Sequence, residues 1–341
     1  MRIGLLNRDT ATSRAVSILV KRFLPQMEIT VFGFDDLLAL WRTKPDMVVS
    51  ILSYPFGKKT ELTREVINLL GIPVVVLFPM EKEAIDPMVS LLESGAVDAI
   101  PYRMENGEDR TVRAVEELAR RIESVAAHCG RVFPLPTRTG SVKLPEEGGG
   151  FQIIVIILSV GGVRSLVSLL SSVPGGFPLP VVVLSQLEKY IFSPLVRRIS
   201  RGYPACVVQT EKALVPGEML IVPKGKTIIF TSDKRKVKLT PLEGRSISES
   251  LISVERAFSG KILLLVLSGE LLDGDDVISR IRKGGSALVC EDPEYAVFPE
   301  APKKLLSKGV CSIVAPEGRI ALAIKKLMEK RKDERNPVCR G

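Results

Sequence analysis

The fold is decided by the stretch IIVIILSVGG at residues 153–162. Its first six residues, Ile153 to Leu158, are all aliphatic, which is typical of a parallel strand that is covered on both faces. Gly161 and Gly162 allow the backbone to turn tightly, so a helix from about Val163 to Ser172 can follow at once. A strand that leads into a helix is the repeating unit of α/β proteins with a parallel sheet.

The first half of the chain repeats this unit. Aliphatic runs such as Pro73-Val74-Val75-Val76-Leu77 predict central strands, and helical stretches alternate with them. Five strand–helix units predict a doubly wound parallel sheet. The predicted strands are 2–6, 28–32, 47–52, 74–77 and 99–101, and the predicted helices are 12–23, 35–41, 60–70, 87–93 and 111–127.

The second half predicts another parallel sheet, with an antiparallel hairpin insert. The hairpin-like stretch is Met219 to Val222 followed by Thr227 to Thr231, with a further strand at Lys236 to Leu239. The other predicted strands are 153–158, 181–184, 262–267, 286–290 and one that begins near Cys311, and the predicted helices are 163–172, 193–201, 246–258, 275–283, 302–307 and a last one that ends at Lys330.

The chain has 341 residues, enough for two domains of ordinary size. Residues 128–150 contain several prolines and the triplet Gly148-Gly149-Gly150, which is typical of a linker. We therefore expect a first domain at 1–127, a linker at 128–150, a second domain at 151–331 and a basic tail at 332–341.

The composition favours a cytoplasmic protein that does not span a membrane. No apolar run reaches the roughly 18 residues that a membrane-spanning helix needs, and the N-terminus leads into a strand without a signal peptide. The five cysteines are odd in number, widely spread and without metal-ligand spacing. We therefore expect reduced thiols, no metal site and no cofactor. The cysteines are at positions 129, 206, 290, 311 and 339.

The net charge of +9 raises the question of nucleic acid. The basic residues are scattered, apart from the stretch from Lys325 to Lys332, and they are not interleaved with stacking aromatic residues. We therefore do not expect nucleic-acid binding. An acidic protein partner would use the same charge and stays open.

Three polar positions follow predicted strands of the second half: Ser159, Ser185-Gln186 and the run from Ser268 to Asp273. In open α/β sheets, chemistry takes place beyond the carboxyl ends of the strands, so we expect these side chains to converge there. A serine nucleophile needs a base, and the only histidine of the chain, His128, lies in the predicted linker. Taken alone, a serine before a glycine pair fits a helix N-cap, and the turn would also leave helix N–H groups that could support an oxyanion.

Several motifs of the second half occur together in one known family. The run from Ile157 to Gly162, the segment Val173 to Gln186 and the segment Val266 to Gly274 resemble the catalytic domain of the chemotaxis protein-glutamate methylesterase, CheB. Val215-Pro216-Gly217 and the segment Glu291 to Phe298 continue the resemblance, which runs in order over roughly residues 151 to 330. The first half resembles the response-regulator receiver that precedes this domain in the family; the matching segments are Lys44 to Val49 and Gly95 to Asp98.

The resemblance implies a catalytic triad that is only partly present. Ser159 falls on the nucleophile and Asp273 on the triad aspartate, whereas Gln186 falls where the family has histidine. The family's threonine after the serine is Val160, and its Gly-Met-Gly is Gly269-Glu270-Leu271. An amide cannot accept a proton at neutral pH, so Gln186 cannot be the general base. We expect Ser159 and Asp273 to be vestigial or structural, with Asp273 bonding backbone N–H groups.

The receiver half departs from the family in the same way. Asn7-Arg8 replaces the acidic pair that holds Mg²⁺ in the family, with only Asp9 nearby, and Ile51 occupies the phosphoacceptor position. Phe78 stands where a Ser or Thr senses the phosphoryl group, and Tyr102 stands in place of the pairing lysine. We therefore expect no phosphorylation and no metal at this site.

These observations leave three hypotheses for the function. The first is a CheB-like binding or scaffolding protein that contacts a methyl-accepting chemoreceptor or another chemotaxis protein. The second is an active or weak methylesterase that hydrolyses receptor glutamate methyl esters through Ser159. The third is a basic surface that binds an acidic partner outside chemotaxis. We expect His128 to be an ordinary histidine and not a substitute base.

Overall fold

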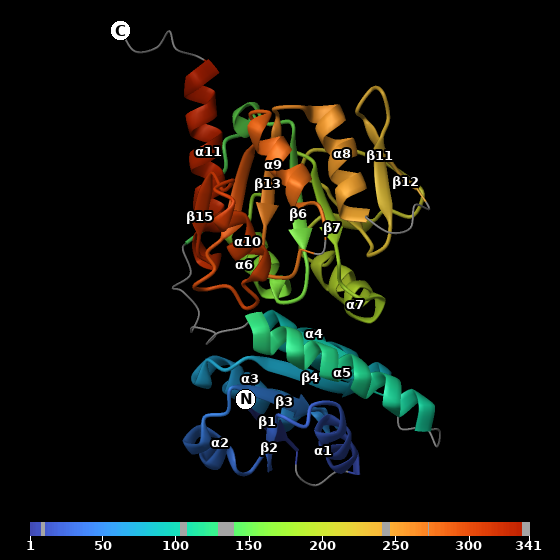
Figure 1. Ribbon diagram of the computed structural model, residues 1–341. Coiled ribbons are helices and arrows are strands. Elements are labelled where there is room, and N and C mark those ends of the chain that lie inside the picture. Colours follow the sequence, from blue (N-terminus) through green and yellow to red (C-terminus); the bar gives the residue numbers. More distant parts are fainter. Residues whose placement is uncertain (8–10, 103–107, 129–139, 241–245, 272, 336–341) are drawn as a thin grey trace. The chain divides into compact units, whose positions relative to one another are not determined.

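A computed structural model describes the whole chain except residues 8–10, 103–107, 129–139, 241–245, 272 and 336–341. The chain divides into two compact units, Met1–Pro134 and Leu135–Gly341, and each is described by itself (Figure 1). Both units are α/β, as the sequence predicts.

The first unit is built on a five-stranded parallel sheet with the order β2-β1-β3-β4-β5. This order confirms the predicted doubly wound sheet, because the chain winds outward from β1 in both directions. Helix α1 contacts α5, and α3 contacts α4, so two pairs of helices accompany the sheet. The elements are β1 (Arg2–Leu6), α1 (Ala11–Phe23), β2 (Glu28–Phe32), α2 (Leu37–Thr43), β3 (Met47–Ile51), α3 (Phe56–Leu70), β4 (Val74–Pro79), α4 (Lys82–Ser94), β5 (Asp98–Tyr102) and α5 (Glu108–His128).

The second unit is built on a seven-stranded parallel sheet with the order β15-β14-β13-β6-β7-β10-β8. The opening stretch of the sequence forms its central strand, β6 (Ile153–Leu158), between β13 (Ile262–Val266) and β7 (Val181–Ser185). The other strands are β8 (Ala205–Val207), β10 (Met219–Val222), β14 (Ala287–Glu291) and β15 (Ile313–Ala315). The helices are η1 (Gly148–Gly150), α6 (Gly162–Ser172), α7 (Lys189–Ile199), α8 (Ser246–Phe258), α9 (Asp275–Lys283), α10 (Glu300–Ser307), η2 (Glu317–Arg319) and α11 (Ile320–Arg335).

The predicted antiparallel insert is present, but its strands differ from the prediction. It is a three-stranded sheet with the order β11-β12-β9, formed by β9 (Glu211–Ala213), β11 (Thr227–Phe230) and β12 (Lys236–Thr240). The predicted pairing of residues 219–222 with 227–231 is wrong, because β10 pairs in parallel with β7 and β8 in the large sheet. All four residues of β10 are buried, and this suits a strand covered on both faces better than a surface hairpin.

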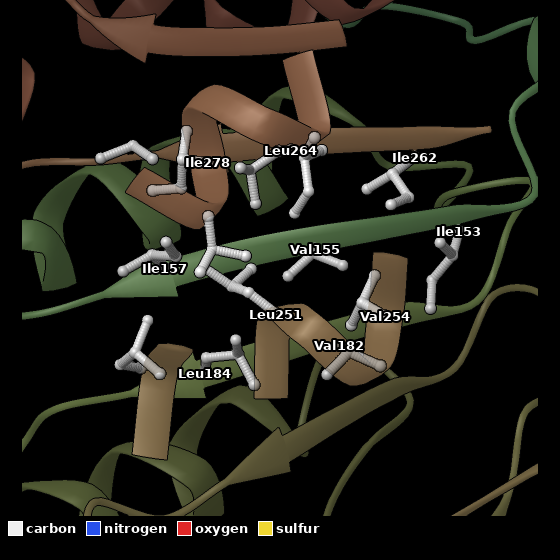
Figure 2. Close-up of a cluster of buried hydrophobic side chains, with 14 of the residues drawn as sticks. Ile153, Val155, Ile157, Val182, Leu184, Leu251, Val254, Ile262, Leu264 and Ile278 are labelled. Atoms are coloured by element: carbon white, nitrogen blue, oxygen red, sulfur yellow. The ribbon is translucent and has the colours of Figure 1, made fainter. Parts of the chain in front are cut away.

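The core of the second unit fills one face of the large sheet. Alternate residues of β6, namely Ile153, Val155 and Ile157, point to this face and pack under α8 and α9 (Figure 2). Leu251 of α8 and Ile278 of α9 are both fully buried there. Helices α6 and α11 contact each other and η2, and Ile154 and Ile156 alternate toward the opposite face of the sheet.

Part of the predicted linker packs on the second unit. Residues 140–150 belong to the second unit, because the Val142 amide donates to the Ser172 carbonyl (2.8 Å) and η1 packs on α11. Gly149 lies so close to Met328 that an added Cβ would come within 2.1 Å of the Met328 carbonyl oxygen. His128 is the last residue of α5 and belongs to the first unit. The predicted tail begins within α11, which continues to Arg335.

Several helices begin earlier than the sequence predicts, and two of them, α4 and α7, extend upstream past a proline. Pro87 and Pro194 suggest first-turn positions, yet both lie inside helices, α4 and α7. Proline lacks an amide proton and therefore costs a helix one hydrogen bond. Both helices bury apolar side chains on each side of the proline, among them Ala84 and Ile191, and this packing extends the helix upstream.

The expectation of reduced thiols is wrong for two of the cysteines. Cys290 and Cys311 form a disulfide, with their Cα atoms 5.9 Å apart. Cys290 lies in β14, and Cys311 comes shortly before the neighbouring strand β15, so the parallel pairing of these strands brings the two residues together. A separation of 21 residues carries no sequence signal for this pairing. Cys206 is a free thiol, and Cys129 and Cys339 lie outside the described residues.

Of the helices in the described part of the chain, none combines the length and the apolar character that crossing a membrane requires.

We expect the variant Cys311→Ser to lose about 3 kcal/mol of unfolding free energy, because the disulfide closes a loop of 21 residues in the unfolded chain. Urea denaturation under oxidising conditions measures this loss, and Cys206→Ser, which removes the free thiol, is the matched control. Equal midpoints for Cys311→Ser and the wild type would show that the thiols are not joined in solution.

Candidate functional site

Ser159 lies immediately after β6, at the carboxyl end of the central strand. Only 5% of its surface is exposed. The chain then turns through Gly161, whose φ of +78° is favoured by glycine, and Gly161 is the N-cap of α6. The interpretation of Ser159 as the helix cap is therefore wrong, because the cap lies two residues further on and has no side-chain hydrogen bond.

Gln186 lies beside Ser159 at the end of the neighbouring strand. Leu158 of β6 and Ser185 of β7 are register partners, and the Gln186 amide donates to the Leu158 carbonyl (2.8 Å). The parallel pairing of β6 and β7 thus brings together two of the residues that the sequence selected. The side-chain Oε1 of Gln186 is buried and has no hydrogen-bond partner among the described residues. A buried amide oxygen in this position is a hydrogen-bond acceptor and not a proton acceptor.

Gly269 covers Ser159 from the other side. It follows β13, which pairs with β6 through Val266 and Ile157. Its φ is +139°, and an added Cβ would lie 2.4 Å from the Cβ of Ser159 and 3.0 Å from its Oγ. Only glycine fits here, because any side chain would overlap the serine.

Two backbone N–H groups near Ser159, those of Gly162 and Gly269, already donate to carbonyls. The Gly162 amide donates to the carbonyl of Ser159 itself (3.1 Å), and the Gly269 amide donates to the Phe298 carbonyl (2.8 Å). The expectation that helix N–H groups at this turn support an oxyanion is therefore wrong for Gly162. An oxyanion needs donors that are oriented toward it before the reaction, and neither of these amides is available.

Asp273 faces the first turn of α8. Its Oδ1 accepts a hydrogen bond from the Ser248 amide (3.0 Å), and its side chain is half-buried. The expectation that Asp273 bonds a backbone N–H is confirmed. A carboxylate at the start of a helix stabilises it through this bond and through the helix dipole.

The sequence did not predict the buried charged side chains Arg164, Glu291 and Glu317. Glu291 is the last residue of β14 and is fully buried, and it accepts hydrogen bonds from Ser165 Oγ (2.9 Å) and the Ser268 amide (2.7 Å). Burial raises the pKa of Glu291 to about 7. Arg164 Nε lies 2.7 Å from Glu317 Oε2, an ion pair whose geometry does not form an aligned hydrogen bond. The one available signal was a carboxylate directly after the apolar run from Ala287 to Cys290.

In the first unit, the carboxyl edge of the sheet carries a different polar network. Asn7 follows β1 and donates from Nδ2 to the Ile51 carbonyl (2.8 Å) and to Ser53 Oγ (3.0 Å). Lys59 of α3 donates from Nζ to the Ser53 carbonyl (3.2 Å), and partial burial lowers the pKa of this ammonium group. Ile51, which the sequence analysis predicts to replace a phosphoacceptor, is fully buried, and its side chain carries no oxygen.

The other two residues that the sequence analysis aligned with receiver switch positions, Phe78 and Tyr102, have aromatic side chains. Phe78 of β4 is almost completely buried. Tyr102, at the end of β5, donates its hydroxyl to the Leu52 carbonyl (2.7 Å), and burial raises the pKa of Tyr102 to about 12. A phenol, an amide and an ammonium group therefore join the strand ends. Arg8 and Asp9 lie outside the described residues.

The chain is similar to known proteins over most of its length. Residues 154–324, half of the chain, match the family model described as CheB methylesterase. The chain is 28% identical over 303 residues to the "Protein-glutamate methylesterase/protein-glutamine glutaminase 1" of Carboxydothermus hydrogenoformans, with 85% of this chain and 87% of that protein covered. It is 24% identical over 313 residues to the "Protein-glutamate methylesterase/protein-glutamine glutaminase 4" of Geobacter metallireducens, with 87% and 90% covered. The solved CheB methylesterase catalytic domain of Thermotoga maritima aligns at a TM-score of 0.47 and 23% identity, over 53% of this chain and 98% of that one.

We expect Gly269→Ala to lower the unfolding free energy by about 2 kcal/mol, because the new methyl group overlaps Ser159 and the positive φ disfavours alanine. Gly175→Ala is the matched control: no atom lies within 4 Å of the added Cβ, so we expect a change of less than about 0.5 kcal/mol. Urea denaturation followed by circular dichroism measures both. If the two variants were equally stable, the close packing of Gly269 on Ser159 would be contradicted.

Proposed function

The chain belongs to the CheB methylesterase family, and we propose that it is a cytoplasmic chemotaxis signalling protein that binds chemoreceptors without turning over their methyl esters at the rate of an intact triad. The curated relatives are named for action on protein glutamate and glutamine, and a receptor segment with these side chains is the partner that this chemistry suggests. The Ser159 site is the surface that we propose for recognition.

One observation carries this proposal: Gln186 lies at the end of the strand next to Ser159, where the family has its general base. The amide oxygen of Gln186 cannot take the proton from Ser159 at neutral pH. In a serine protease, loss of the catalytic serine or histidine lowers turnover by roughly a million-fold. We therefore expect any remaining turnover to be that of a site without a general base.

The N–H groups around Ser159 support the same conclusion. The Gly162 and Gly269 amides donate to protein carbonyls, so they are not available to stabilise a tetrahedral intermediate. Asp273, the family's triad aspartate, uses Oδ1 to bond the first turn of α8. His128, the only histidine of the chain, ends α5 in the first unit.

We also propose that the first unit is not switched by phosphorylation. The phosphoacceptor position is the buried Ile51, which has no atom that could accept a phosphoryl group. Mg²⁺ needs oxygen ligands with near-octahedral geometry, and Asn7 directs the amide NH₂ toward this edge, where the family has an acidic residue. The ammonium group of Lys59 occupies the same edge and would repel a divalent cation.

We expect the wild-type protein to release no more methanol from carboxymethylated chemoreceptor than Ser159→Ala does. The reason is the missing base, so Gln186→His should raise methanol release above both. The assay is release of labelled methanol from receptor-containing membranes, with ammonia release from receptor glutamine followed in parallel.

The binding half of the proposal has its own measurement. Co-sedimentation of the wild-type protein with the same membranes should show binding that weakens as salt rises, because a protein with a net charge of +9 approaches an acidic receptor segment. Wild-type turnover that Ser159→Ala abolishes would establish the alternative, an active methylesterase. Absence of both binding and turnover would contradict both the binding function and the methylesterase function.

We expect acetyl phosphate with Mg²⁺ to leave the first unit unmodified, because Ile51 offers no carboxylate. Intact-mass measurement after incubation with acetyl phosphate detects a phosphoryl group directly, and an active response-regulator receiver treated in parallel is the positive control. A stoichiometric mass increase of one phosphoryl group that hydroxylamine removes would refute the proposed loss of the switch.

A further inference from the structure

The proposed function makes no use of the buried charged side chains Arg164, Glu291 and Glu317. Glu291 is 0% exposed, and Arg164 and Glu317 are 4% and 3% exposed. Two carboxylates thus share the interior with one guanidinium group, which is already paired with Glu317. A buried carboxylate without a cation of its own is held near its neutral form, so a proton can be gained or lost here under mild conditions.

Glu291 joins two elements that form the Ser159 site. Its Oε1 accepts from Ser165 Oγ on α6, the helix that begins three residues after Ser159. Its Oε2 accepts from the amide of Ser268, directly after β13. Both are short hydrogen bonds, at 2.9 Å and 2.7 Å, and both lie away from water.

Ser268 is connected to Ser159 through Gly269. Gly269 is the next residue, and its Cα lies so close to Ser159 that an added Cβ would be 3.0 Å from Ser159 Oγ. The backbone of Gly269 is fixed on both sides, because its amide donates to Phe298 and its carbonyl accepts from the Ala301 amide (2.9 Å). Gly269 follows Ser268 directly, so a change in the Ser268 hydrogen bond acts on the residue next to the one that packs on Ser159.

The electrostatics place the titration of this carboxyl in the neutral range. Burial is the largest cause of its raised pKa of about 7, and the nearby charge of Glu317 raises it further. The hydrogen bonds from Ser165 and Ser268 and the charge of Arg164 act in the opposite direction. Among the described residues, Glu317 and Arg164 are the charged groups that act on Glu291; the adjacent Cys290 is held in its disulfide.

We propose that Glu291 is a proton-linked positioning residue, which holds Ser268 and Gly269 firmly against Ser159 when it is ionised and less firmly when it is protonated. Ionised Glu291 gives both donors a charged acceptor, and such hydrogen bonds are about twice as strong as neutral ones. On protonation, the added proton comes from solvent, the new carboxyl O–H donates to Ser165 Oγ, and the Ser165 hydroxyl reverses from donor to acceptor. The Ser268 amide then bonds a neutral oxygen.

This inference goes beyond the proposed function. It requires neither a receptor nor turnover, so it can fail while receptor binding stands, and it can hold if receptor binding fails.

The test is a pH titration of the backbone amides in the full-length protein by NMR. We expect the Ser268 amide proton of the wild type to move downfield between pH 6 and pH 8 with a midpoint near 7, and the Ser159 amide to follow the same midpoint. After correction for the intrinsic exchange rate, protection of the Ser268 amide should rise about fivefold over this range. The Ile154 amide, which donates to the Pro180 carbonyl, is the internal control and should stay constant.

Two variants assign the titration. Glu291→Gln keeps an oxygen for Ser268 and an NH₂ group for Ser165, so it imitates the protonated form, and both shifts should become independent of pH. Ser165→Ala removes a donor that favours the anion, so the midpoint should move to higher pH. Glu270→Gln, which neutralises a half-buried carboxylate of the same turn, is the matched control and should leave the midpoint unchanged.

Each result decides the inference. A Ser268 shift that is absent between pH 6 and pH 8 in the wild type would overturn it even if Glu291→Gln did not fold. A shift that persists in Glu291→Gln would assign the titration to another group. If the Ser268 amide shift titrates and the Ser159 amide shift does not, the positioning role is contradicted and Glu291 is only a structural carboxyl.

Discussion

The parallel pairing of β6 with β7 and β13 is the constraint on which the Ser159 site depends. Ser159, Gln186 and Gly269 come from three distant segments, and each follows one of these strands. The ladder fixes where the strands end, so the Gln186 amide reaches the Leu158 carbonyl and Gly269 reaches the serine. Replacing a reactive side chain at this edge changes the chemistry and leaves the geometry in place, because the backbone ladder holds the positions.

The two units illustrate the same point with different groups. In the first, the side chains of Asn7, Lys59 and Tyr102 donate to backbone carbonyls at the ends of the strands. In the second, the backbone amide of Gln186 bonds the Leu158 carbonyl at the end of the neighbouring strand. In both units these hydrogen bonds are made to a backbone edge that the strand pairing fixes.

The fold could be predicted from the sequence largely because buried parallel strands carry an unmistakable pattern. The run Ile153 to Leu158 and the run Val74 to Leu77 gave the correct central strands. Short strands such as β8 and β9 have too few residues for any period, and β10 was given the wrong partner because strand pairing is decided by tertiary contacts that a local pattern does not contain. The disulfide was missed for the same reason, since the 21-residue separation says nothing of two adjacent strands.

The candidate site was predictable in its positions and not in its partners. Ser159, Gln186 and Asp273 follow strands or their turns as expected. The role of Glu291 became visible only in the structure, where Ser165 of α6 and Ser268 after β13 both donate to it. The sequence likewise did not show that Gln186 Oε1 is buried without a hydrogen-bond partner among the described residues. Leaving a buried acceptor without a donor costs about 1 to 3 kcal/mol, so this oxygen lowers the stability that the second unit gains from its strand pairing.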